Sequence, residues 1–153
     1  MKALYVDVDG VLNNHLWADK VLQEDGYDPY DYDELCPANM KNLANICQAT
    51  NPYVVISSSW RWDETALNNL KKEFSYYRIP IHDYTILEPT TTLSREKEIA
   101  LHLSQHPEIT NFCILDDDDS IKNEPFKSHH IKTTLHRGLT REDTIKAIGV
   151  LNE

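Results

Sequence analysis

"YVDVDGVLNN", residues 5–14, joins an apolar run to two acidic residues and a glycine. The apolar residues around Tyr5 predict a buried strand, because strands of a parallel sheet that is covered by helices on both faces are apolar almost throughout. Asp7 and Asp9 follow at the end of that strand, where burial of a carboxylate is costly unless something compensates its charge. We therefore expect the charge of these two residues to have a function.

The rest of the chain alternates between predicted strands and predicted helices. Apolar runs predict strands at residues 2–6, 52–57 and 110–116, a short strand within 77–87, and a more polar strand near an edge at 129–134. Helical spacing of apolar residues predicts helices at 36–50, from Asp63 to about 74, from Ser94 to about 106, and after Thr140. Ser94 and Thr140 are typical N-cap residues.

This alternation predicts an α/β fold, a doubly wound, Rossmann-like parallel sheet with helices on both faces. In such sheets ligands bind beyond the carboxyl ends of the strands. Three of the predicted strands end in polar clusters, which are Asp7 with Asp9, Ser57–Ser59 and Asp116–Asp119. If the strands are parallel, the three clusters meet at one rim of the sheet. We therefore expect the functional site at that rim.

Composition limits the function classes. A chain of 153 residues predicts a single domain over residues 1–153. The net charge of −10 disfavours an extended nucleic-acid-binding surface but suits a bound divalent cation. The apolar runs are too short to span a membrane, and the start has no signal-peptide apolar region, so we expect a cytoplasmic protein. Without a CxxC pair, the cysteines are interpreted as reduced thiols: Cys36, Cys47 and Cys113.

Four motifs of the chain, in order, resemble those of the haloacid dehalogenase (HAD) superfamily of phosphotransferases. They are "VDVDGVLN", "VVISSSW", "SREKEIALHL" and "CILDDDD", which span residues 4–119. The longer strings "DVDGVLN", "SSSWR" and "ILDDDD", with "GLT" before the last helix, are similar to those of small phosphatase-like modules in bacterial RNA-repair proteins. The gaps in which HAD enzymes insert a large cap domain are short here. The resemblance therefore implies a HAD-like fold without a large cap and with an open site.

The resemblance assigns the chemistry of the first motif. It implies that Asp7 attacks phosphorus and forms an aspartyl-phosphate, which divides one difficult step into two easier ones. Asp9, whose side chain can lie on the same side of the strand, would protonate the departing oxygen and then accept a proton from water. Gly10 would let the backbone turn sharply and approach the phosphate closely.

The resemblance also implies a bound Mg²⁺, which reduces the repulsion between an attacking carboxylate and a phosphate. Its ligands would be Asp7, the backbone carbonyl of Asp9 and a carboxylate of the fourth motif. Asp117 is the favoured direct ligand and Asp116 its neighbour, although four consecutive aspartates leave the register open.

Phosphate binding would come from the second and third motifs. Ser58 best matches the phosphate-binding hydroxyl of the family, and Ser57 is the alternative. Arg95 or Lys97 would supply the positive charge, and both are predicted to lie in the first turn of a helix, where a cation opposes the helix dipole. A bound phosphate would relieve that conflict.

Three further features have a structural interpretation. Residues 14–35 form an acidic, aromatic insert, which we interpret as a solvated excursion in preference to a flap over the site. His102 and His106 have an i, i+4 spacing that could bind zinc, but no HExxH motif surrounds them, and we expect a solvated helix face. The aromatic segment 60–62 either lines the entrance or packs in the interior.

The predicted function is a Mg²⁺-dependent phosphomonoester hydrolase whose open site suits a large phosphorylated substrate, such as a polynucleotide end or a phosphoprotein. The alternatives are a small-metabolite or nucleotide phosphatase, and a phosphotransferase with an acceptor other than water. A catalytically silent binding or regulatory module with the same fold is a third alternative. The presence of both Asp7 and Asp9 argues against that module.

Overall fold

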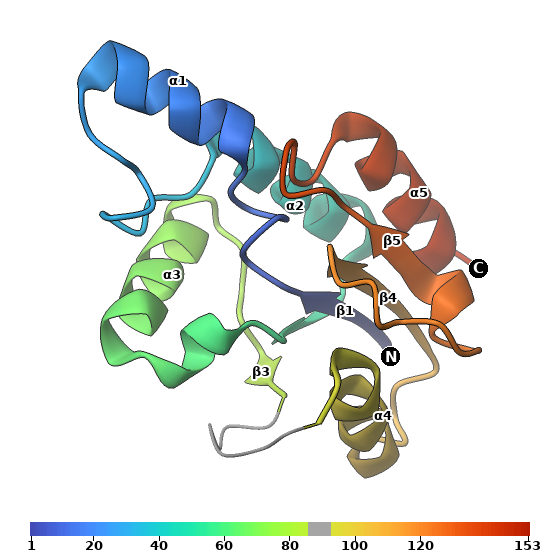
Figure 1. The fold of residues 1–153 in the computed structure, drawn as a ribbon. Coiled ribbons are helices and arrows are strands. Elements are labelled where there is room, and N and C mark those ends of the chain that lie inside the picture. The colour runs from blue at the N-terminus through green and yellow to red at the C-terminus, as the bar shows by residue number, and fades with distance from the viewer. Residues whose placement is uncertain (86–92) are drawn as a thin grey trace.

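Five parallel strands form one sheet in a computed structural model that describes residues 1–85 and 93–153 (Figure 1). The order across the sheet is β3-β2-β1-β4-β5. The strands are β1 (Lys2–Val6), β2 (Tyr53–Ile56), β3 (Asp83–Tyr84), β4 (Asn111–Asp116) and β5 (His130–Lys132). Each of the five lies within a stretch predicted as a strand, and the predicted doubly wound parallel sheet is confirmed. Residues 86 and 87 of the predicted stretch 77–87 lie outside the described residues.

Helices cover both faces of this sheet (Figure 1). They are α1 (His15–Asp25), α2 (Pro37–Thr50), α3 (Glu64–Tyr76), α4 (Arg95–Gln105) and α5 (Arg141–Leu151). The larger core contains Leu4 and Val6 of β1 together with buried residues of α2, α3 and α5. The smaller core contains Ala3 and Tyr5 of β1 with Ile99 of α4. Alternate residues of β1 thus face two cores, and α4 packs on the face opposite α2, α3 and α5.

The helix starts follow the capping residues of the sequence. The side chains of Asp63, Ser94 and Thr140 each accept a backbone N–H of the third residue beyond, from Ala66, Lys97 and Asp143 respectively. Pro37 occupies the first turn of α2, where its missing N–H costs nothing. These starts fix where Arg95 lies, in the first turn of α4 at the rim of the sheet.

The insert at residues 14–35 contains α1, which the sequence analysis did not predict. Asn14 caps this helix by accepting the N–H of Trp17, and Gly26 ends it with a left-handed backbone. The insert returns to the point from which it leaves, because the N–H of Cys36 donates to the carbonyl of Leu12 at 2.8 Å. No large cap domain is present in the described ranges.

The cysteines are free thiols, as expected. Burial raises the pKa of Cys47 and of Cys113 to about 12. A thiol that remains protonated is a poor nucleophile. In the part of the chain that the structure describes, no helix has the length and apolar character needed to cross a bilayer.

Candidate active site

The ends of β1, β2 and β4 bring the predicted polar clusters to one rim. Val6 is in register with Ile56 of β2 and with Leu115 of β4, so the next residue of each strand stands at the same level. The N–H of Asp7 donates to the carbonyl of Leu115, and the N–H of Ser57 donates to the carbonyl of Val6, both at 3.0 Å. The sheet therefore sets the positions of the clusters.

Three carboxylates converge at this rim. Asp7, Asp116 and Asp117 each offer an oxygen, and these oxygens lie within 4.8 Å of one another. Burial, followed by the nearby charge of Asp116, raises the pKa of Asp7 well above its usual value. Burial also raises the pKa of Asp116 and of Asp117. Like charges held this close and partly out of water favour proton uptake or a nearby cation.

Arg95 supplies part of that compensation. Its Nε lies 3.0 Å from Oδ2 of Asp116, and its Nη2 lies 3.8 Å from Oδ1 of Asp7. Burial opposes the charge of Arg95, but Asp116, then Asp7 and Glu98, outweigh it and raise the pKa of the guanidinium. Lys97, the other candidate of the third motif, has an exposed side chain. Of the two cations, Arg95 is the one that contacts the carboxylates.

The acidic cluster can accept a divalent cation in addition to Arg95. Arg95 Nε and Asp116 Oδ2 are close but not aligned for a hydrogen bond, and neither atom has a hydrogen-bond partner among the described residues. A buried carboxylate oxygen without a donor is costly. Carboxylate oxygens are the ligands that Mg²⁺ prefers. The donor set of Asp7, Asp116 and Asp117 therefore fits Mg²⁺.

The two serines after β2 differ in their partners. Oγ of Ser58 accepts the N–H of Trp60 at 3.2 Å and caps a 3₁₀ turn at Ser59–Trp62. Oγ of Ser57 is buried and has no hydrogen-bond partner among the described residues. Ser57, the alternative candidate at the sequence level, is thus the serine with a vacant hydroxyl beside the carboxylates.

Asp9 lies at the edge of the site and is held in place by two neighbours. Nδ2 of Asn13 donates to Oδ1 of Asp9 at 2.8 Å, and the indole N–H of Trp60 lies 3.3 Å from both Asp9 oxygens. Asp9 itself is exposed, whereas Asp7 is buried. Trp60 is largely buried, so it packs in the interior and also orients Asp9.

Gly10 has a backbone conformation that side chains rarely adopt, with φ at +78°. A Cβ at this position would lie 2.7 Å from Cγ of Asp117, which is closer than a van der Waals contact. The N–H of Gly10 donates to Asn13, and its carbonyl accepts the hydroxyl of Thr133 at 2.6 Å. Gly10 thus allows the loop that follows β1 to lie against Asp117 of the fourth motif.

A buried ionic network below Arg95 was not predicted. The carboxylate of Glu98 accepts the hydroxyl of Thr85, pairs with Arg61, and lies 3.1 Å from Nη1 of Arg95. Nη1 of Arg61 donates to the carbonyl of Ser58 at 2.5 Å. The i, i+3 spacing of Arg95 and Glu98 is the sequence signal that could have revealed the pair. Through Glu98, α4 is joined to the loop that carries Ser58.

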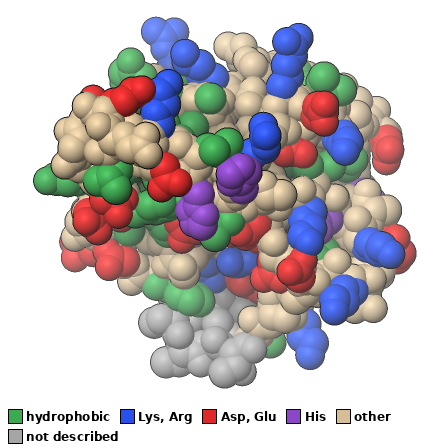
Figure 2. All heavy atoms as spheres, turned by 45° about the horizontal axis from the view of Figure 1, so that its top comes forward, with side chains coloured by type: hydrophobic (Ala, Val, Ile, Leu, Met, Phe, Trp, Pro, Cys, Tyr) green, Lys and Arg blue, Asp and Glu red, His purple; other side chains and the backbone are tan. Residues whose placement is uncertain are grey.

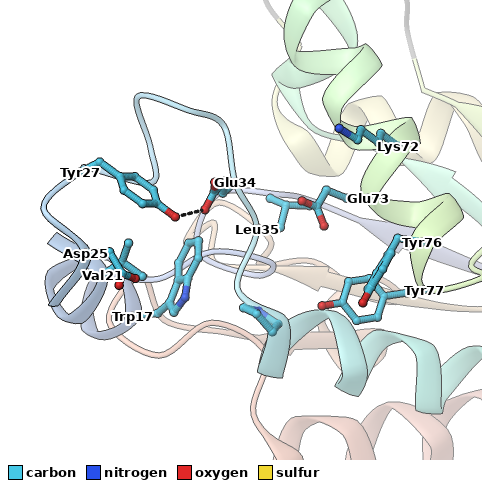
Figure 3. Close-up of a pocket in the computed structure, with 11 residues that line it drawn as sticks. Trp17, Val21, Asp25, Tyr27, Glu34, Leu35, Lys72, Glu73, Tyr76 and Tyr77 are labelled. Carbon is cyan, nitrogen blue, oxygen red and sulfur yellow. Dashed lines mark hydrogen bonds between the residues drawn. The ribbon is translucent and has the colours of Figure 1, made fainter.

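A hollow of about 340 Å³ opens beside the acidic cluster. Its lining includes Arg61, Trp62, Arg95 and Asp118. A second pocket, of about 400 Å³, lies between α1 with its following loop and α3 (Figure 3). None of the strand-end residues line that second pocket, and its walls are aromatic and acidic, as Tyr27 donating to Glu34 at 2.9 Å illustrates. Of the two, the first hollow is the one whose lining includes Arg95 and two residues of the strand-end clusters, Ser59 and Asp118.

The comparisons with known proteins agree with this geometry. Residues 3–144 match the family model described as the HAD domain in Swiss Army Knife RNA repair proteins. The chain belongs to this family. The resemblance that the motifs indicated is thereby confirmed over most of the chain. No curated protein and no solved structure matches the chain significantly.

The prediction for the histidines of α4 is wrong. His102 is buried, not part of a solvated helix face, and its ring lies between Tyr5 and Asp83. His106 is a quarter exposed and stacks on the His102 ring with the centroids 4.1 Å apart. The apolar spacing of this helix did not indicate that the polar residues His102 and Glu98 are buried as well.

Proposed function

We propose that this chain is a Mg²⁺-dependent phosphomonoesterase that acts on the phosphorylated end of a polynucleotide through an aspartyl-phosphate. The observation that carries this proposal is the convergence of Asp7, Asp116 and Asp117 with Arg95 at one rim of the sheet. Family membership supports the reaction class, since HAD domains are generally phosphatases, and the family's occurrence in RNA repair proteins supports the substrate.

Asp7 is assigned the nucleophilic role. It stands on the central strand, buried, and is held by the backbone hydrogen bond from its N–H to β4. An oxygen of Asp7 forms a bond to phosphorus while the bond from phosphorus to the substrate oxygen breaks. Mg²⁺ at Asp7, Asp116 and Asp117 would neutralise the charge that otherwise repels the phosphate from the carboxylate.

Asp9 is assigned the proton transfers. Its carboxyl group gives a proton to the departing substrate oxygen. In the second step its carboxylate takes a proton from water, whose oxygen attacks phosphorus, and the bond between phosphorus and Asp7 breaks to release inorganic phosphate. The contacts of Asn13 and Trp60 orient Asp9 for both transfers. Its exposure at the edge of the site gives water access to it.

Arg95 and the serines after β2 are assigned to the phosphate oxygens. Nη2 of Arg95 is available to a phosphate oxygen, because its ion pair with Asp7 is long, at 3.8 Å. Ser57 offers the hydroxyl without a partner among the described residues, and Ser58 can donate its proton while it still accepts the N–H of Trp60. Binding at this point would also place negative charge at the first turn of α4, where it is favoured.

The absence of a large cap from the described ranges favours a substrate that cannot enter an enclosed cavity. On the face shown in Figure 2, Lys and Arg side chains are interspersed with Asp and Glu side chains. Such a surface does not grip a long polyanion. We therefore propose that the site binds a terminal phosphate and makes few contacts with the rest of the strand.

The test is phosphate release from a panel of substrates with and without Mg²⁺. The panel contains 3′- and 5′-phosphorylated oligonucleotides, mononucleotides, an aryl phosphate and phosphopeptides. Asp7→Asn is the test variant, and Asp119→Asn, which changes an exposed aspartate of the fourth motif, is the matched control. We expect Mg²⁺-dependent release from an oligonucleotide, on the order of 10³-fold or more lower in Asp7→Asn, with the control near wild type.

Each other outcome rejects a part of the proposal. Full activity in Asp7→Asn would exclude Asp7 as the nucleophile. Release from mononucleotides or phosphopeptides alone would reject the polynucleotide substrate and keep the reaction. If the folded chain released phosphate from no substrate of the panel, the result would favour the binding or regulatory module. Transfer of phosphate to an added alcohol in preference to water would identify a phosphotransferase.

A further inference from the structure

A second group of side chains that could hold a metal ion lies where β3 meets α4, away from the acidic cluster. Asp83 of β3 and His102 and His106 of α4 each offer an atom, and these atoms lie within 4.8 Å of one another. Nε2 of His102 lies 2.8 Å from Oδ2 of Asp83, and Nε2 of His106 lies 3.4 Å from the same oxygen. The geometry points to a zinc site formed by Asp83, His102 and His106.

Nδ1 of each histidine ring has a hydrogen-bond partner, and Nε2 of each ring faces the carboxylate of Asp83. The Nε2 atoms are therefore the ones that would bind a metal. Nδ1 of His106 lies 2.8 Å from the carbonyl of His102, and a carbonyl only accepts, so Nδ1 carries the proton. In the neutral ring, Nε2 of His106 then has a lone pair that faces the carboxylate of Asp83. Two acceptors facing each other are unfavourable, and a cation between them removes the conflict.

His102 has the equivalent arrangement through Tyr5. Nδ1 of His102 lies 2.8 Å from the hydroxyl oxygen of Tyr5, which is fully buried. The phenol oxygen of Tyr5 can accept the Nδ1 proton of His102. Histidines that bind metals usually donate their other ring N–H to an oxygen in this way. Both rings of the cluster therefore have the outer partner that a metal site requires.

The ligand set selects the metal. Two imidazole nitrogens and one carboxylate oxygen suit Zn²⁺, whereas Mg²⁺ prefers oxygen ligands alone. In tetrahedral zinc sites with bonds of about 2.0–2.1 Å, neighbouring ligand atoms are about 3.3 Å apart. The 3.4 Å from His106 to Asp83 meets this spacing, and the 2.8 Å from His102 to Asp83 would lengthen when an ion enters. The side chains of Asp83 and His106 are 31% and 25% exposed, so an ion can enter and water can take the fourth position.

A bound ion would connect two elements that share little else. β3 is an edge strand of two residues, and α4 is the helix whose first turn carries Arg95 and Glu98. The carboxylate of Asp83 on the strand and the two imidazoles on the helix would then share one ion.

The test uses Co²⁺ as a spectroscopic replacement for Zn²⁺ on the full chain. A site with two imidazoles and tetrahedral geometry gives strong visible absorption, while Co²⁺ among carboxylates and water absorbs only weakly. We expect one strongly absorbing Co²⁺ per chain in the presence of excess Mg²⁺, displaced by one equivalent of Zn²⁺. His106→Gln and Asp83→Asn should each abolish the band, and both positions are exposed enough to tolerate the change.

Controls separate this site from other histidines and from the acidic cluster. His136→Gln makes the same change at an exposed histidine and should keep the band. Tyr5→Phe removes only the outer partner of His102 and should weaken Zn²⁺ binding by about 10–100-fold. A folded wild type without the band would overturn the inference, as would a band that persists in both His106→Gln and Asp83→Asn. Those results would leave a hydrogen-bonded His–Asp cluster without a metal.

Discussion

The acidic cluster at the strand ends and the Asp83–His102–His106 cluster both lie against α4, and they differ in what balances their charge. In the acidic cluster three carboxylates face one guanidinium, and a buried oxygen of Asp116 has no hydrogen-bond donor among the described residues. In the second cluster one carboxylate faces two imidazoles, each of which is hydrogen-bonded through Nδ1. An oxygen-only set with excess negative charge suits a hard cation, whereas the mixed set suits zinc.

Glu98 lies on α4 between the two clusters, and its neutralisation should have the largest effect. Glu98→Gln leaves the fully buried Arg61 guanidinium without its carboxylate, which should lower the free energy of unfolding by about 3–5 kcal/mol. Urea denaturation measures this loss. Glu142→Gln, an exposed glutamate in the first turn of α5, is the control. A loss below about 1 kcal/mol would mean that the network contributes no more than a surface ion pair.

Arg95→Ala tests whether the acidic cluster works independently of the second cluster. Removal of a preorganised cation should lower kcat for phosphate release by about 10²–10³-fold. Lys97→Ala, two residues along the same helix turn, should change kcat by no more than about twofold, because its charge is exposed. Co²⁺ absorption at the histidines should remain in both variants. If Arg95→Ala and Lys97→Ala lowered kcat equally, neither residue could be assigned as the cation of the third motif.

Gly10→Ala tests the close approach of the first loop to Asp117. The left-handed backbone and the collision with the carboxylate should together cost about 1–3 kcal/mol in the free energy of unfolding, and Mg²⁺ affinity should fall with it. Gly26→Ala is a matched control, since Gly26 has φ at +76° but a Cβ added there would meet no atom within 4 Å among the described residues. If both variants lose the same stability, the contact with Asp117 contributes nothing.

Asp7→Asn should stabilise the metal-free chain slightly at neutral pH. Burial, then Asp116, raise the pKa of Asp7 in the folded chain above its usual value of 3.8. Between the two pKa values the folded chain holds more protons than the unfolded chain, so stability falls as the pH rises. A gain of about 1 kcal/mol would raise the Tm of the variant by about 2–4 °C at pH 7.

The pH dependence of that gain distinguishes its cause. Near pH 4 the wild-type carboxyl group is protonated and resembles the amide, so the difference in Tm should disappear there. Thermal unfolding in a chelating buffer at both pH values measures it. A difference of the same size at pH 4 and pH 7 would contradict a charge effect at Asp7.

The fold and the acidic cluster could be predicted because their signals are local. A buried strand is a short apolar run, and Asp7 and Asp116 come directly at the ends of such runs. Parallel pairing then brings the strand ends together without any knowledge of side-chain contacts. The sequence leaves the choice between Arg95 and Lys97 open, because helix phase relative to the sheet depends on how α4 packs.

The burial of the second cluster and helix α1 in the insert were not predicted, for physical reasons. β3 is two residues long, and the predicted stretch 77–87 did not place Asp83 at a particular position of the strand. The pairing of Asp83 with His102 depends on an edge strand and a helix that meet only in the fold. The polar side of α4 was predicted to be solvated, although Glu98 and His102 are buried. Helix α1 has few inward apolar residues, with Ala18 the one that is buried, so its periodicity was weak.

The hydrogen bond from Cys36 to Leu12 also bears on how this architecture can vary. Because the insert at residues 14–35 leaves and returns at neighbouring positions, it can change length at a small entropic cost, about 0.6 kcal/mol for each doubling of its length. Asp7 is anchored separately, because strands lie on either side of β1, the strand that it follows. Exchange of residues 14–35 for a longer or shorter segment should therefore alter which molecules reach the rim while the reactive groups keep their places, which makes this junction the natural position for engineering substrate choice.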